Sequence, residues 1–145
     1  MRVPADDEPT VILAAGEPSP LRLVLSSPQR PYQDVIVDYL VTVSGAGLEA
    51  RTVVTSQEGD SLDAYFSGLA EGFRGWTGVR EWRSLEGQFR AEARWANRGH
   101  VKLYLRLRAT AYDTAWDVSF EFDIEAGAEM ESLSIEVSNF FAAAR

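Results

Sequence analysis

Histidine is the side chain best suited to acid–base catalysis near neutral pH, and this chain contains one, His100. A single histidine excludes metal sites built from several histidines, and a Ser-His-Asp arrangement would have to use this residue. His100 follows a predicted turn at residues 96–99, where packing or a hydrogen bond is its usual role. A hydrolase would have to pair His100 with Glu86 or Asp117. We predict no catalytic residue, no metal and no cofactor.

Two tryptophans offer a different chemistry, the binding of an apolar ligand. Trp76 and Trp82 flank a glycine turn after the first predicted helix and lie outside the main alternating strands. Aromatic side chains at such corners usually fill the core. Together with Tyr104 they could instead line an apolar pocket between a sheet and the first helix, which would make the protein a small-molecule-binding module.

Composition limits the classes of partner and compartment. The chain has 145 residues, no cysteine and a formal net charge of -8. The negative charge argues against nucleic-acid binding but permits a basic protein partner. The absence of cysteine fits a reducing compartment, and the acidic opening segment does not resemble a signal peptide. No apolar run reaches the length of a membrane-spanning helix. We therefore predict a cytoplasmic location without membrane contact, and the oligomeric state stays open.

The elements that must position these residues begin after a short acidic segment. Pro4 and Pro9 bracket that segment, so we predict a flexible tail over residues 1–9 and a single domain over residues 10–145. Four strands are expected in the first half, at residues 11–14, 21–25, 35–43 and 48–55. Asp60 or Ser61 can then cap a helix whose apolar residues recur at spacings of three and four up to Phe73.

Three further strands alternate almost without error, at residues 89–95, 101–109 and 116–124. Their apolar positions are odd in the first two runs and even in the third, which predicts one common inner surface. The outer positions are charged, with basic residues dominating the second run and acidic residues the third. We predict a ladder of opposite charges that fixes the register on a solvated face, in preference to a ligand-binding surface.

The last segment, from Gly127 to Ala144, fits either a strand or a helix by periodicity. Its length, its early glutamates and its alanine-rich end favour a helix. The chain is thus predicted to be an α+β protein, with a twisted antiparallel β-sheet of about seven strands and two helices packed on one face.

Several short motifs carry a resemblance to a known family. They are Gly75-Trp76, Trp82, Ser84-Leu85-Glu86-Gly87 and Gly99-His100-Val101. With them, the chain from about the first hairpin to the last helix resembles a bacterial, actinobacterial-type family known only as a domain of unknown function. The resemblance implies a small single-domain protein and no particular activity. It draws attention to Trp82, Glu86 and His100, although such residues can equally serve folding.

Three functions therefore compete. The first is a non-enzymatic interaction protein, such as an immunity or antitoxin-like protein whose acidic surface occupies a basic site on its partner. The second is the small-molecule-binding module near Trp76 and Trp82, and the third is the hydrolase using His100. The candidate ligand-binding or partner-binding residues are Trp76, Trp82, Glu86, His100 and Tyr104.

Overall fold

The computed structural model describes residues 9–15, 21–112 and 115–144. Its elements are β1 (Thr10–Ala15), β2 (Leu21–Gln29), β3 (Ile36–Gly45), β4 (Leu48–Gln57), α1 (Leu62–Glu71), β5 (Val79–Arg83), β6 (Phe89–Ala96), β7 (His100–Arg108), β8 (Asp117–Glu125) and α2 (Ala128–Ala142). A three-residue 3-10 helix, Asn97–Gly99, joins β6 to β7. The predicted tail over residues 1–9 lies outside the described residues, apart from Pro9.

The α+β class and the antiparallel pairing are confirmed, but the strands divide between two sheets. The first sheet has the order β1-β2-β3-β4 and the second sheet the order β5-β6-β7-β8, in place of one sheet of about seven strands. Strand β5 is missed by the sequence reading because it spans only five residues, three of them charged. Alternation shows which side chains are buried and not what covers them, so two facing sheets produce the same pattern as one.

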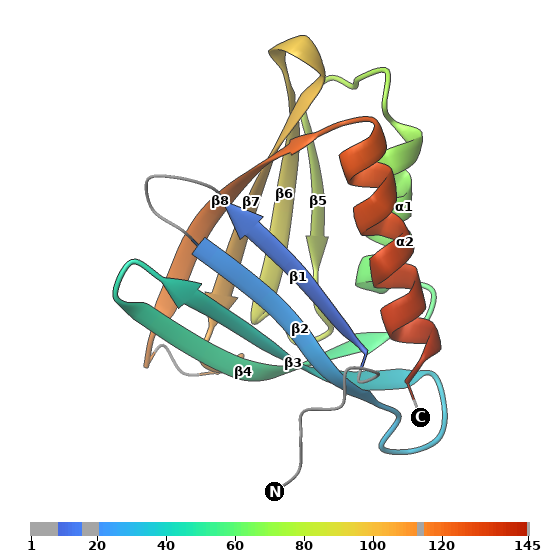
Figure 1. Ribbon diagram of the computed structural model, residues 1–145. Coiled ribbons are helices and arrows are strands. Elements are labelled where there is room, and N and C mark those ends of the chain that lie inside the picture. The colour runs from blue at the N-terminus through green and yellow to red at the C-terminus, as the bar shows by residue number, and fades with distance from the viewer. Residues whose placement is uncertain (1–8, 16–20, 113–114, 145) are drawn as a thin grey trace, which may run out of the picture.

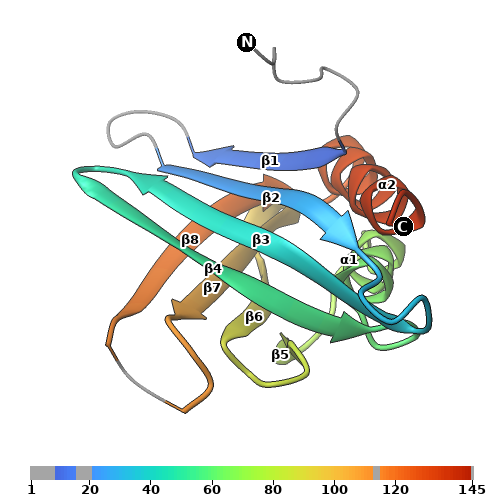
Figure 2. The ribbon, with the colours of Figure 1, turned by 90° about the horizontal axis from the view of Figure 1, so that it is seen from below.

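The two sheets cross one another, and α1 and α2 lie side by side along one side of the molecule (Figure 1, Figure 2). Helix α2 reaches the first sheet, where the rings of Phe140 and Phe141 meet Tyr39 edge-on at centroid distances of 6.0 and 5.2 Å. Helix α1 reaches the second sheet, where Tyr65 lies 6.3 Å from Trp82. The buried side chains of both sheets and both helices accordingly form a single hydrophobic cluster.

The predicted inner surface of the second sheet is confirmed. Phe89, Leu103 and Leu107 are completely buried, and Phe122 is nearly so. Each buried residue of β7 faces an apolar residue of β6 and of β8, as the pairing of Leu103 with Ala93 and Phe122 illustrates. Alternation was sufficient here because all three strands hide the same face.

Both helices occupy the predicted segments, with one difference at the end of α1. Ser61 is the residue before α1, and the segment after Gly127 is helical over Ala128–Ala142, as predicted. Helix α1 ends at Glu71, however, so Phe73 does not continue its apolar face and is 52 % exposed. Glycine supplies the break, since Gly72 follows the last helical residue and Gly75 adopts a φ of 106°, which suits glycine alone.

Neither helix in the described part of the chain is long and apolar enough to cross a lipid bilayer.

Candidate functional site

Trp82 and Tyr104 lie on opposite faces of the second sheet. Trp82 points inward and is 8 % exposed, its ring lies 5.7 Å from that of Phe89, and its Nε1 donates a hydrogen bond to the Asp60 carbonyl at 3.1 Å. Tyr104 points outward and is 44 % exposed. The structure therefore does not bring Tyr104 into one pocket with the tryptophans.

Trp76 is held between its neighbours beyond the end of α1. The Arg80 guanidinium carbon lies 4.3 Å from its ring centroid, and the ring of Trp95 lies 5.7 Å away. Its Nε1 donates to the Ala93 carbonyl at 3.4 Å. These contacts occupy the faces and edge that a flat apolar ligand would need, and they tie the segment after α1 to the second sheet.

The Ser84-Leu85-Glu86-Gly87 motif is a turn that fastens the second sheet to β4. The Ser84 hydroxyl is buried and lies 3.3 Å from the Gln88 side-chain oxygen, while Gln88 Nε2 donates to the Val53 carbonyl at 3.1 Å. The Leu85 amide donates to the Thr55 carbonyl at 3.0 Å. Buried polar groups matched in this way fix the geometry of a junction. Glu86 is exposed at the tip of the turn.

His100 lies at one end of the second sheet, and both Glu86 and Asp117 lie at the other end. Glu86 precedes Phe89, which pairs with Leu107 near the end of β7. His100 begins β7 and pairs with Glu125 at the end of β8, whereas Asp117, at the start of β8, pairs with Arg108 at the far end of β7. His100 Nδ1 instead lies 2.7 Å from the Asp123 carboxylate on the exposed surface. Neither pairing considered for a hydrolase, with Glu86 or with Asp117, is assembled.

A groove runs between the end of α1 and the start of α2. Its volume is about 570 Å³, and it is lined by Ser67, Ala70, Glu71, Phe73, Gly127, Ala128, Glu131 and Ser134. Small residues form part of the lining, and the exposed Phe73 ring contributes an aromatic wall. Ser134 is 8 % exposed and also lines the groove. A serine hydroxyl can act as both a donor and an acceptor toward a ligand.

The electrostatics of this groove favour a positive ligand. Neither α1 nor α2 contains a lysine or arginine, and neither Glu71 nor Glu131 forms an ion pair with a described residue. The end of α1 contributes the negative pole of its dipole. The positive end of α2 is already satisfied, because the amides of Gly127 and then Glu129 donate to Glu125 and hold the pKa of that carboxyl below its usual range.

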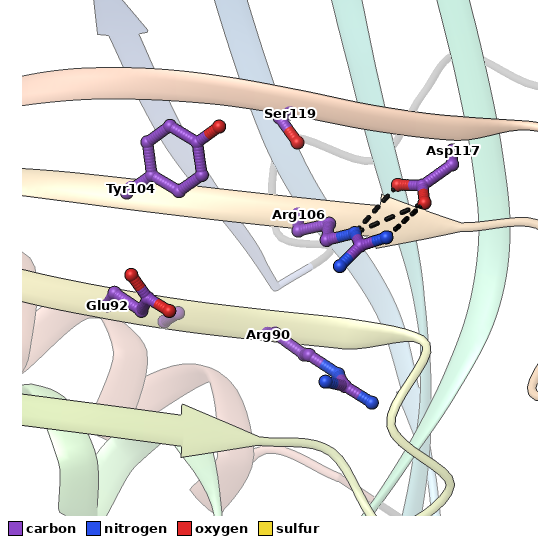
Figure 3. Close-up of a pocket in the computed structure, with 7 residues that line it drawn as sticks. Arg90, Glu92, Tyr104, Arg106, Asp117 and Ser119 are labelled. Atoms are coloured by element: carbon purple, nitrogen blue, oxygen red, sulfur yellow. Dashed lines mark hydrogen bonds and ion pairs between the residues drawn. The ribbon is translucent and has the colours of Figure 1, made fainter.

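A second hollow lies on the outer face of the second sheet. Its volume is about 410 Å³, and it is lined by Arg90, Ala91, Glu92, Tyr104, Arg106, Asp117 and Ser119. Figure 3 shows these side chains on β6, β7 and β8. The Nε and Nη2 atoms of Arg106 donate to Asp117 at 2.9 and 2.5 Å. Arg90 Nε donates to the Gly87 carbonyl at 3.0 Å.

The predicted ladder of opposite charges is confirmed between β7 and β8. Lys102 Nζ lies 2.5 Å from Asp123, directly opposite, and Arg106 binds Asp117 on a diagonal. The Arg106 hydrogen bond lowers the pKa of the Asp117 carboxyl. The Lys102 hydrogen bond, with a further one from His100, lowers that of Asp123. Hydrogen bonding to the charged form of a carboxyl has this effect.

The ladder prediction is wrong for the other strands of the same face. Residues of the same sign stand opposite each other there, as Arg83, Arg90 and Arg106 do across β5, β6 and β7. Glu81 likewise faces Glu92. The sequence did not predict these pairs. Two of them involve β5, which was not predicted, and the third depends on the register that the turn between β6 and β7 sets.

In the described part of the chain, no group of three or more histidine, cysteine, aspartate or glutamate side chains is placed to hold a metal ion.

Comparison with family models matches residues 14–144 to a family of unknown function, DUF6228. The match agrees with the kind of family that the motifs suggested, while the motifs themselves and an actinobacterial origin stay predictions. Comparison with curated proteins and with solved structures gives no match.

Proposed function

This chain belongs to the DUF6228 family, whose function is unknown, and we propose that it is a non-enzymatic module that binds a basic segment of a partner protein in the groove between α1 and α2. The single observation that carries the proposal is that Glu71 and Glu131 both line this groove while neither helix carries a positive side chain.

The lining of the groove suits a lysine or arginine side chain of the partner. Ala70, Ala128 and the Phe73 ring can receive its aliphatic stem, because such stems pack on apolar surface while the charged head stays polar. Glu71, Glu131 and the Ser134 hydroxyl offer acceptors for the head. The guanidinium of this chain's own Arg74 already lies over the Phe73 ring, its carbon 5.4 Å from the centroid, so a partner's side chain would have to use the rest of the ring or displace Arg74.

Acidic residues elsewhere on and beside the two helices would also speed the encounter with a basic partner. Glu58, Asp60 and Asp63 precede or begin α1, and Glu129 and Glu136 are exposed on α2. Charge of one sign on one side of a protein raises association rates and selects against acidic partners. An immunity or antitoxin-like protein, which covers the basic site of a toxin, is one form of this function.

The test uses the full chain as bait, with a photo-crosslinking residue at Ser67, in an extract of its source organism. We expect a basic protein to crosslink to the bait, and to be lost when Glu71→Lys and Glu131→Lys are combined. Glu49→Lys with Glu86→Lys changes the net charge equally at exposed positions outside the groove, and this control should retain the partner.

The proposal fails if no protein crosslinks at Ser67. It also fails if both double variants lose the partner equally, since that result would indicate attraction by net charge alone. Circular dichroism of each variant establishes that the fold is unchanged before the comparison is made.

A further inference from the structure

Three arginines stand in a row across the second sheet, on the outer face that the helices do not cover. Arg83 on β5 faces Arg90 on β6, and Arg90 faces Arg106 on β7. Neighbouring strands lie about 4.8 Å apart, and like charges directly opposite each other on one face are unfavourable. The row therefore has to be explained by something other than pairing within the sheet.

The protein itself compensates for only part of this positive charge. Arg106 is paired with Asp117, but Arg90 donates only to a backbone carbonyl, that of Gly87. Arg83 and Arg90 form no ion pair with any residue that the structure describes. Arg83 and Arg90 thus keep their charge without an ion-pair partner, although the carboxylates of Glu92 and Asp117 line the hollow beside Arg90 and Arg106.

Further hydrogen-bond donors line the hollow beside these arginines. In Figure 3 the guanidinium groups of Arg90 and Arg106 lie on the same side of the hollow, and the Nη1 atom of Arg106 carries none of its bonds to Asp117. The hydroxyls of Tyr104 and Ser119 line the same hollow, and neither has a hydrogen-bond partner among the described residues.

We propose that this hollow binds the phosphate or carboxylate group of a small molecule between Arg90 and Arg106. The planar guanidinium matches two oxygens of such a group at once, which a lysine does not. The Ser119 hydroxyl adds a neutral donor from β8. Because the hollow is open to solvent, screening keeps the affinity in the millimolar range.

The far end of the hollow determines what else the ligand carries. Tyr104, 44 % exposed, offers a ring face, and Glu92 offers a carboxylate that accepts hydrogen bonds. A fitting ligand therefore has an oxyanion that binds the arginines and, near it, a ring that packs on Tyr104 or a hydroxyl group that donates to Glu92. A free anion such as inorganic phosphate satisfies the arginines alone and should bind more weakly.

This site is independent of the groove between the helices. It lies on the outer face of the second sheet, while α1 contacts the inner face through Tyr65 and Trp82. The two sites also select ligands of opposite charge, so the failure of one proposal leaves the other standing.

The experiment is an NMR titration of the full chain with inorganic phosphate, phenyl phosphate and succinate at constant ionic strength. We expect the amides of residues 90, 104, 106 and 119 to shift, with phenyl phosphate binding tighter than inorganic phosphate. Comparing phenyl phosphate with succinate shows whether the natural oxyanion is a phosphate or a carboxylate. Arg90→Gln should raise the Kd about tenfold, equivalent to roughly 1.4 kcal/mol.

Arg94→Gln is the matched control, because Arg94 is exposed on the same face of β6 and lies outside the hollow. It should change the Kd by less than about twofold. Ser119→Ala keeps every charge and should raise the Kd about threefold. The proposal is overturned if the shifts lie elsewhere, if none of the three anions binds, or if Arg90→Gln and Arg94→Gln weaken binding equally.

Discussion

The two halves of the charged outer face follow opposite rules. Between β7 and β8, positive side chains meet negative ones, as Lys102 meets Asp123. Across β5, β6 and β7, like meets like, as Arg83, Arg90 and Arg106 do. Both halves cover the same apolar inner surface and share β7, so the difference does not come from the core.

The charged pairs between β7 and β8 stabilise the fold, whereas the like charges across β5, β6 and β7 do not. Opposite charges on neighbouring strands favour one register, because a slip would break them. Like charges in the correct register oppose that same pairing. The core must therefore hold β5, β6 and β7 together against a small repulsion, which leaves Arg83 and Arg90 available for binding.

The largest effect should come from the core beneath both halves. Leu103 is completely buried and lies between Ala93 and Phe122. Leu103→Ala removes its contacts and leaves a cavity, so the free energy of unfolding should fall by about 3 kcal/mol. Urea denaturation measures this loss. Leu85→Ala, at a residue 49 % exposed, should cost less than about 0.5 kcal/mol, and equal losses would mean that the core does not dominate.

A smaller effect should follow from breaking an ion pair between β7 and β8. Asp117→Asn removes the negative charge and one of the two oxygens that accept from Arg106, so the melting temperature should fall by about 2 °C. Glu121→Gln makes the same charge change on β8 at a residue with no ion pair among the described residues. A melting temperature lowered as much by Glu121→Gln would show that net charge, and not the pair, is responsible.

Acid should weaken the ion pairs between β7 and β8 and so lower the free energy of unfolding. The pKa values of Asp117 and Asp123 are lowered in the folded protein, first by hydrogen bonds from Arg106 and Lys102 respectively. Their stabilising contribution is complete above the unfolded carboxyl pKa of about 3.9 and is lost as pH falls through the lower folded value. The variant combining Asp117→Asn and Asp123→Asn should lose less stability than the parent between about pH 5 and pH 2.5. Parallel losses in urea denaturation would contradict this assignment.

Much of the fold could be predicted because burial follows a period. Strands β6, β7 and β8 alternate strictly, and α2 is long enough for its helical spacing to outweigh a strand reading. Strand β5 could not be found in this way, since its five residues include three charges. The division into two sheets was also hidden, because Tyr39 is buried equally well by α2 or by another strand.

The candidate sites were harder to predict because they depend on which surfaces meet. The groove requires α1 to end at Glu71 and Phe73 to leave the helix, although the lack of basic residues over both helices was visible in the sequence. The arginine row requires the register of β5. The structure gives Trp82 and Ser84, which belong to the motifs of the family resemblance, packing roles at junctions, and a binding role for Trp82 stays a prediction.

The most direct test of the contrast is the free energy of unfolding of Arg83→Gln, measured in urea without added anions. Arg83 faces Arg90 and has no ion pair among the described residues. If the arginine row opposes strand pairing, this variant should be more stable than the parent, by about 0.3 kcal/mol. A loss of stability of that size or larger would contradict the account, because it would show that the row supports the fold.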